Sequence, residues 1–206
     1  AERLSCQLII SHHPLLFHPL RTVSDTTYQQ RCVIRAVTSG IAIYSAHTSL
    51  DNARGGVNFK IAEKIGLEGL CWLSAREDAD AGSGVIGELR APMAERDFLL
   101  MLKDKFRVRC LKHSATTGKM IKRVAVCGGA GAFLLPDAIR KEADCFVCGE
   151  FHYHDWFENS GVTLAELGHY ESEQFTQELL LELLSSAFPG IDARITAAHT
   201  NPINCL

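Results

Sequence analysis

Five side chains that can bind divalent metal ions occur in three short motifs of this chain. Imidazole and carboxylate groups are common metal ligands, and two ions held side by side can activate a shared water for hydrolysis. The sequence therefore predicts a hydrolytic metal site. The expected ligands are His12, His13, Asp51, His169 and Glu173.

Spacing suggests a role for each group. His12 and His13 are adjacent and can point to different metals, while His169 and Glu173, four residues apart in a helix, share one face. Glu173 has the reach to bridge two ions, and Asp51 is the expected terminal oxygen ligand. All of these donor atoms are nitrogen or oxygen. The bound metal can therefore be zinc, manganese, iron, cobalt or magnesium.

Each motif also has a simpler interpretation. The paired histidines precede Pro14 and can form a polar turn, and His169 with Glu173 can be a surface pair on a helix. Asp51 can instead cap a turn or a helix. The ordinary interpretation of four further polar groups at strand ends is a solvated loop residue. They are His47, Glu150, His154 and Asp155.

Apolar periodicity predicts alternating strands and helices, which is typical of an α/β fold with a parallel or mixed sheet. Residues 77–84 are the candidate loop or hinge, and the last helix should bury a stripe that includes Leu179, Leu183 and Phe188. Strands are expected over 8–10, 41–46, 106–111, 122–127 and 144–148, and helices over 26–40, 58–65, from Pro92 through Leu102, 134–143 and 170–188.

The glycines of Gly128–Gly131 follow an expected strand. The segment lacks the lysine and the serine or threonine of a P-loop, so a close-packed strand-to-helix turn is favoured over a phosphate cradle.

Composition limits the classes of partner and the cellular compartment that we expect for this protein. The chain has 206 residues and a net charge of −3, so nucleic acid is not an expected partner, although a local basic patch stays open. No apolar stretch is long enough to span a membrane. The eight cysteines suggest buried free thiols in a reducing, cytoplasmic compartment. Cys145 and Cys148 could alternatively bind zinc.

Four segments in order resemble the signatures of the Nif-three-like family, whose members are often labelled GTP cyclohydrolase I type 2 or dinuclear metal-centre proteins. They are Leu8–Leu15, Tyr44–Asp51, Val147–Glu150 and Gly168–Glu173.

This resemblance implies two divalent metal ions per chain, held by the five ligands named above, with Glu173 touching both. It also implies two similar α/β lobes with a mixed sheet and the metal cleft between them, and assembly into a homohexamer. The expected division is a first lobe over 1–75, a second lobe over 76–160 and a return to the first lobe over 161–206.

Three departures from the family pattern stand out. The usual opening region is absent, so we expect the first lobe to lack its N-terminal part. Cys148 replaces the threonine that usually precedes Gly149. His154 falls where relatives often carry a histidine, which makes it a candidate cleft residue rather than a ligand.

The expected function is that of a metal-dependent hydrolase acting on a nucleotide or a similar phosphorylated small molecule, with His47 or His154 moving protons. The alternative is a non-enzymatic, ring-shaped interaction or regulatory module whose metals are structural or stored.

Overall fold

The computed structural model describes residues 1–76 and 80–204. It has the predicted mixed α/β architecture and divides into two compact units, Ala1–Leu50 and Asp51–Leu206. We call these the first unit and the second unit. The lobe boundaries expected near residues 75 and 160 stay a prediction.

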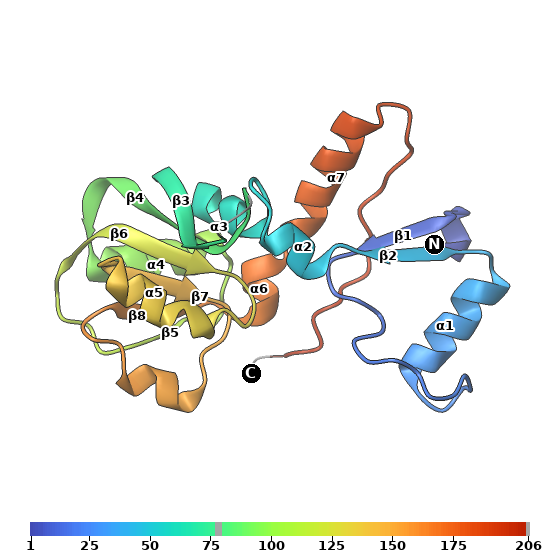
Figure 1. The fold of residues 1–206 in the computed structure, drawn as a ribbon, viewed down its shortest axis with the longest axis horizontal. Coiled ribbons are helices and arrows are strands. Elements are labelled where there is room, and N and C mark those ends of the chain that lie inside the picture. Colours follow the sequence, from blue (N-terminus) through green and yellow to red (C-terminus); the bar gives the residue numbers. More distant parts are fainter. Residues whose placement is uncertain (77–79, 205–206) are drawn as a thin grey trace. The chain divides into compact units, whose positions relative to one another are not determined.

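The first unit contains a parallel pair of strands joined through a helix (Figure 1). The strands pair in register from Leu8 with Ala42 to Ser11 with Ser45. The connecting helix begins with a capping box formed by Thr27 and Gln30. The strand before His12, the helix and the second strand therefore agree with the sequence prediction. The elements are η1 (Glu2–Leu4), β1 (Leu8–Ser11), α1 (Tyr28–Thr38) and β2 (Ala42–Ser45). The division between the units falls at the end of α2 (His47–Asp51).

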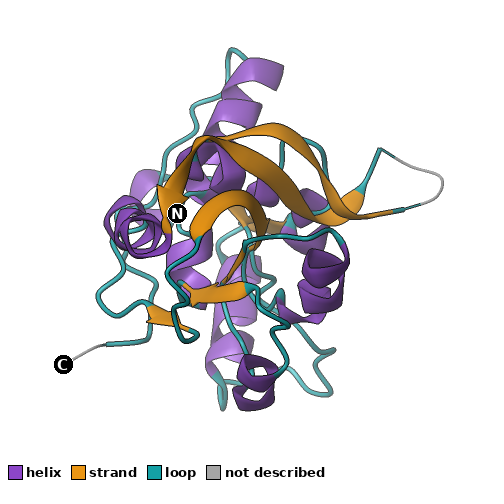
Figure 2. Cartoon of the chain, turned by 90° about the vertical axis from the view of Figure 1, so that its left-hand side faces the viewer, coloured by secondary structure: helices purple, strands orange, loops and turns teal. Residues whose placement is uncertain are grey.

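The second unit is built on a mixed, six-stranded sheet in the order β3-β4-β6-β7-β8-β5. Neighbours β6, β7 and β8 are parallel, while the β3–β4, β4–β6 and β5–β8 pairs are antiparallel. The long strands of this sheet are strongly twisted (Figure 2). The strands are β3 (Leu67–Ala75), β4 (Gly82–Ala94), β5 (Lys112–His113), β6 (Met120–Cys127), β7 (Cys145–Cys148) and β8 (Thr163–Glu166).

Helices cover both faces of this sheet (Figure 1). On one face α3 and α4 contact β4 and β6, and Phe98 and Leu102 of α4 are fully buried. On the other face α5 packs with Ile86, Phe146 and Leu164 in one apolar cluster. The helices are α3 (Val57–Ile65), α4 (Glu95–Lys105), η2 (Ala132–Leu134), α5 (Leu135–Arg140), η3 (Tyr153–Phe157), α6 (His169–Glu173) and α7 (Thr176–Ala187).

Two predictions around α4 are wrong. Pro92 does not start the helix but lies in β4, where the pairing with β6 is irregular between Glu88 and Met93. A proline fits there because it has no N–H to donate to a ladder. The strand expected over 106–111 is absent because Arg107 adopts a left-handed conformation and the amide of Val108 donates to Lys103.

The single helix expected over 170–188 is also wrong. The chain forms α6 and α7, which are separate helices with Gln174 and Phe175 between them. Within the expected stripe Leu179 is buried, but Leu183 is 47% exposed and Phe188 is 60% exposed. The helical period is correct, but burial decreases toward the end of α7.

The cysteines agree only in part with the prediction that they are buried free thiols. The described cysteines are free thiols, of which Cys127, Cys145 and Cys148 are buried and Cys32, Cys71 and Cys110 are exposed. Burial raises the pKa of Cys148 to about 12. Cys145 and Cys148 are three residues apart in β7 and so point to opposite faces of the sheet, which does not suit a shared zinc.

The predicted loop over 77–84 lies partly outside the described residues, and its last part, from Gly82, belongs to β4. Among the helices of the described residues, none is long and apolar enough to cross a membrane.

A buried carboxylate stabilises the second unit. Glu95 is 2% exposed and accepts hydrogen bonds from the amides of Thr117 and Gly118, both at 2.8 Å, and from the Thr163 hydroxyl. Burial raises its pKa, but the bonds from Thr163, Gly118 and Thr117 outweigh burial and bring the pKa below its ordinary value. The ionised group thus stabilises the fold above its unfolded pKa, and this contribution is lost as the pH falls through the folded pKa.

We therefore predict that Glu95→Ala lowers the free energy of unfolding by about 3 kcal/mol at neutral pH, because three donors lose a charged acceptor. Denaturant unfolding at pH 7 and pH 3 measures the effect, which should shrink at the lower pH. Glu88→Ala is the control, since this half-exposed carboxylate pairs with Lys122 and Arg123 at 3.5 and 3.6 Å on the surface. Equal losses in the two variants would contradict the prediction.

Candidate functional site

Three imidazoles lie together at the carboxyl ends of β1 and β2 in the first unit. The ring centroids are 4.7 Å apart for His12 and His13, 5.8 Å for His12 and His47, and 5.5 Å for His13 and His47. The β1–β2 hydrogen bonds continue past the strands, from the amides of Ala46 and His47 to the carbonyls of Ser11 and His12. The parallel ladder therefore places both histidine motifs at one edge of the sheet.

Local contacts fix this cluster. The Ser11 hydroxyl donates to the carbonyl of His13 at 2.8 Å and lies 2.8 Å from the Ser45 hydroxyl. His47 starts α2 with a φ of 35°, a left-handed value that side-chain-bearing residues rarely adopt. The first unit thus holds three imidazoles close together, and the backbone of one of them, His47, is strained.

In the second unit, His169 and Glu173 form an acid–base pair on α6. The Nε2 atom of His169 lies 3.4 Å from Oε2 of Glu173, and its Nδ1 atom lies 3.1 Å from Oε1 of Glu150. Beyond the β7–β8 pairing, the amides of Leu167 and Gly168 donate to Cys148 and Gly149. These bonds bring the start of α6 directly to the carboxyl edge of the sheet.

The two carboxylates change the proton affinity of the imidazole. The hydrogen bond to Glu173 is the largest cause, and together with the charges of Glu173 and Glu150 it outweighs burial and raises the pKa of His169 to about 9. At neutral pH the imidazole is therefore protonated between two carboxylates. A divalent metal ion is a chemically sensible replacement for that proton, because it also needs an imidazole and carboxylates.

A glycine turn after β6 makes room for Glu173. A Cβ atom on Gly129, whose φ is 58°, would lie 2.4 Å from Oε1 of Glu173 and 3.2 Å from Nε2 of His169. A Cβ on Gly149 would lie 2.4 Å from the carbonyl oxygen of Gly129. The Gly128–Gly131 segment is therefore the close-packed turn that the sequence favoured, and the closest neighbours of Gly129 are two of the expected ligands.

Asp51 is fixed to the same turn through Asn58. The Asn58 side chain donates to the carbonyl of Asp51 at 3.0 Å and accepts from the amide of Gly128 at 2.9 Å. Burial raises the pKa of Cys127, the last residue of β6, and Cys148, Asp51 and Glu173 raise it further. The carboxylates of Asp51 and Glu173 thus both act on the thiol at the end of β6.

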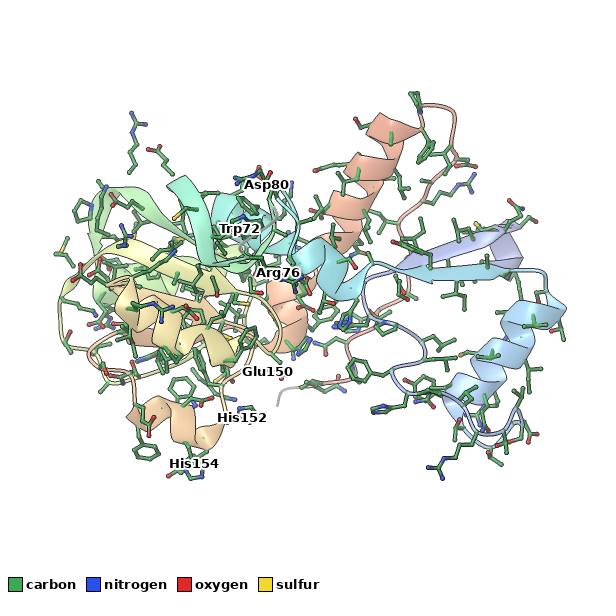
Figure 3. All side chains as sticks on the ribbon, in the orientation of Figure 1. Trp72, Arg76, Asp80, Glu150, His152 and His154 are labelled. Carbon is green, nitrogen blue, oxygen red and sulfur yellow. The ribbon has the colours of Figure 1, made fainter. Side chains whose placement is uncertain are left out.

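The structure brings most of the predicted site residues together within their own units. His12, His13 and His47 cluster in the first unit, and His169 pairs with Glu173 in the second. His154, by contrast, is exposed on η3 and points away from Glu150 (Figure 3). Its part in proton movement stays a prediction.

Sequence reasoning missed Glu150, Ser172 and Asn58. Glu150 had the ordinary interpretation of a solvated loop residue, and its side chain is indeed 53% exposed, yet it contacts His169. Its position directly after β7 and Gly149, in one of the recognised motifs, was the available signal. Ser172 and Asn58 each also bond to the glycine turn, which lies far away in the chain, and no local pattern reveals such a contact.

A cavity of about 880 Å³ opens beside α6 in the second unit. Its walls include Glu150, Tyr170, Arg107, Arg109 and Lys112. Lys112 is paired with the nearly buried Glu166 at 2.6 Å. The volume is in the range of small-molecule sites, which is roughly 300 to 1,000 Å³.

The site motifs lie in a segment that matches one family model almost from end to end. The model for Duf34/NIF3 (NGG1p interacting factor 3) matches residues 1–202. The chain belongs to the DUF34/NIF3 family. The resemblance that the four motifs indicated is thereby confirmed.

Members of the DUF34/NIF3 family with curated names include two bacterial proteins called GTP cyclohydrolase 1 type 2 homolog. The one from Clostridium perfringens is 30% identical over 176 residues, covering 84% of this chain and 67% of the relative. The one from Lactococcus lactis is 30% identical over 208 residues, covering 98% and 78%. The Protein NIF3 homolog of Schizosaccharomyces pombe is 27% identical over 202 residues, covering 91% and 71%.

Solved structures confirm the DUF34/NIF3 fold. A Staphylococcus aureus hypothetical protein matches with a TM-score of 0.90 at 25% identity, covering 97% of this chain and 80% of its own. A Bacillus cereus protein related to NIF3 matches with a TM-score of 0.86 at 20% identity, covering 99% and 84%.

The close approach of Gly129 to Glu173 gives a direct prediction. In metal-free protein, Gly129→Ala should displace the Glu173 carboxylate from His169 and lower the pKa of His169 from about 9 toward its ordinary value of 6.5. An NMR titration of the His169 ring measures this shift. The control is Gly161→Ala, because Gly161 also has a positive φ, of 84°, but no atom lies within 4 Å of its added Cβ. A variant that keeps the wild-type pKa of His169 would rule the explanation out.

Proposed function

We propose that this DUF34/NIF3 chain is a metal-dependent hydrolase that acts on a nucleotide or a similar phosphorylated small molecule. In this proposal two divalent metal ions are held by His12 and His13 of the first unit and by Asp51, His169 and Glu173 of the second. The observation that carries the proposal is the His169–Glu173 pair, closed against a glycine turn and supported by Glu150.

The donors in each unit fit divalent metal ions. The first unit offers imidazoles with ring centroids no more than 5.8 Å apart, and the second offers an imidazole and a carboxylate 3.4 Å apart. The side chain of Glu173 is only 9% exposed, and the place of a Cβ on Gly129 is filled by its carboxylate. A bound divalent ion would supply Lewis acidity and lower the pKa of a water.

Two residues of the chain would have supporting roles: one would orient a metal ligand and the other would transfer protons. Glu150, on Nδ1 of His169, would fix the ring so that Nε2 is the ligating atom, the usual arrangement in which a carboxylate orients a metal-binding histidine. His47 lies beside His12 and His13 and is the candidate for moving a proton to or from the substrate.

The substrate class rests on the cavity of the second unit and on the names of the relatives. The cavity has room for a molecule of nucleotide size, and Arg107 and Arg109 on its wall offer positive charge to a phosphate group. The bacterial relatives are called GTP cyclohydrolase 1 type 2 homologs, which supports a nucleotide. The homohexamer and the exact substrate stay predictions.

A substrate screen tests the proposal. Protein isolated with its native metal should contain about two ions per chain and turn over a member of a nucleotide and phosphoester panel. His13→Ala and Glu173→Ala should lower turnover at least about 100-fold, since changes that only support a ligand already cost 10 to 100-fold. His113→Ala, a change to an exposed imidazole in β5, is the control. Fully loaded protein that is inert across the panel would overturn the hydrolase and favour the binding module.

Metal binding should also release protons. Because the pKa of His169 in metal-free protein is about 9, the group is charged at pH 7 and must lose its proton to become a ligand. Calorimetric titration with Zn²⁺ in two buffers of different ionisation enthalpy should show release of about one proton per chain at pH 7, and less at pH 9.5. Proton release that does not decrease with rising pH would speak against His169 as a ligand.

A further inference from the structure

Two buried polar side chains of the second unit lie beside the predicted ligands without belonging to the ligand set. Ser172 and Asn58 are each 2% exposed. The Ser172 hydroxyl accepts from the amide of Gly129 at 3.0 Å and donates to the carbonyl of His169 at 2.8 Å. Both of its partners therefore belong to backbone that carries or contacts expected ligands.

Asn58 makes the corresponding connection on the other side of the turn. Its amide nitrogen donates to the carbonyl of Asp51 at 3.0 Å, and its oxygen accepts from the amide of Gly128 at 2.9 Å. The amide of Glu150 donates to the carbonyl of Gly129 at 2.9 Å. Three backbone polar groups of one turn thus each bond to a different segment of the candidate site.

This pattern is more than general stabilisation of the core. Burying a hydroxyl or an amide is unfavourable unless its hydrogen bonds are satisfied. Each of these two side chains satisfies them between the turn and a ligand-bearing segment, at sequence separations of 43 residues for Ser172 to Gly129 and 70 for Asn58 to Gly128. Ser172 and Asn58 thus fix the positions of the segments that carry His169 and Asp51 relative to the glycine turn after β6.

We infer that Ser172 and Asn58 are positioning residues that hold His169–Glu173 and Asp51 in metal-binding register on the Gly128–Gly129 turn. The inference rests on the proposed metal site. Neither side chain is a ligand; each acts through the backbone of a segment that carries one.

The test measures Zn²⁺ affinity and stability separately, by competition with a chromogenic chelator and by thermal unfolding of metal-free protein. Ser172→Ala should lower the affinity for Zn²⁺ about tenfold, as loss of support for a ligand commonly does. Ser114→Ala is the matched control. Ser114 is also buried, and its hydroxyl accepts a hydrogen bond from the amide of Leu164 at 3.0 Å. This bond lies within the β5–β8 region and does not involve the Gly128–Gly129 turn. We expect it to lower the unfolding temperature while leaving the affinity within about twofold.

Asn58→Leu and its matched control Gln30→Leu form a second, independent pair of variants. Gln30 is a buried amide of the first unit that bonds to Thr22 and Ser24. Asn58→Leu should lower Zn²⁺ affinity and Gln30→Leu should not; if Asn58→Leu does not fold, the serine pair decides. Wild-type affinity in Ser172→Ala, or an equal loss in Ser114→Ala, overturns the inference. Wild-type protein that binds no Zn²⁺ overturns the metal site itself, and the two failures are therefore distinct.

Discussion

The contact between the Glu173 carboxylate and the backbone of Gly129 is the constraint on which the second unit's half of the site depends. A Cβ at residue 129 would come within 2.4 Å of Oε1 of Glu173, and the φ of 58° also favours glycine, so only glycine leaves the Glu173 carboxylate where it is. With α6 in place, His169 lies between Glu173 and Glu150, and its raised pKa follows from that position. The same turn holds Asp51 through Asn58 and the segment at His169 through Ser172.

The two units share one means of placing their polar groups. In each of them, hydrogen bonds of a parallel strand pair continue past the strands and bring two segments to the carboxyl edge of the sheet. In the first unit these segments carry His12 and His47, and in the second they carry Glu150 and His169. The carboxyl ends of parallel strands are where open α/β sheets place their chemistry. A mixed sheet suffices, because only β6, β7 and β8 need to run in parallel at that edge.

Sequence reasoning reached the motif residues because their chemistry is local. His12, His13, His169 and Glu173 stand beside apolar runs whose strand and helix character could be predicted, and the structure contains β1 and α6 at those places. It failed at Pro92 and over 106–111, where an irregular sheet pairing and a left-handed residue override local preference. The roles of Ser172 and Asn58 could not be predicted, since the glycine partner of each lies 43 and 70 residues away, respectively.

The most direct measurement of the central claim is anomalous scattering from crystals of the metal-loaded protein, recorded on both sides of the metal's absorption edge. We expect two peaks, with ligand atoms of His12, His13, Asp51, His169 and Glu173 within about 2.0 to 2.2 Å of them. Peaks at the cysteines of β7, or peaks remote from His169 and Glu173, would contradict it.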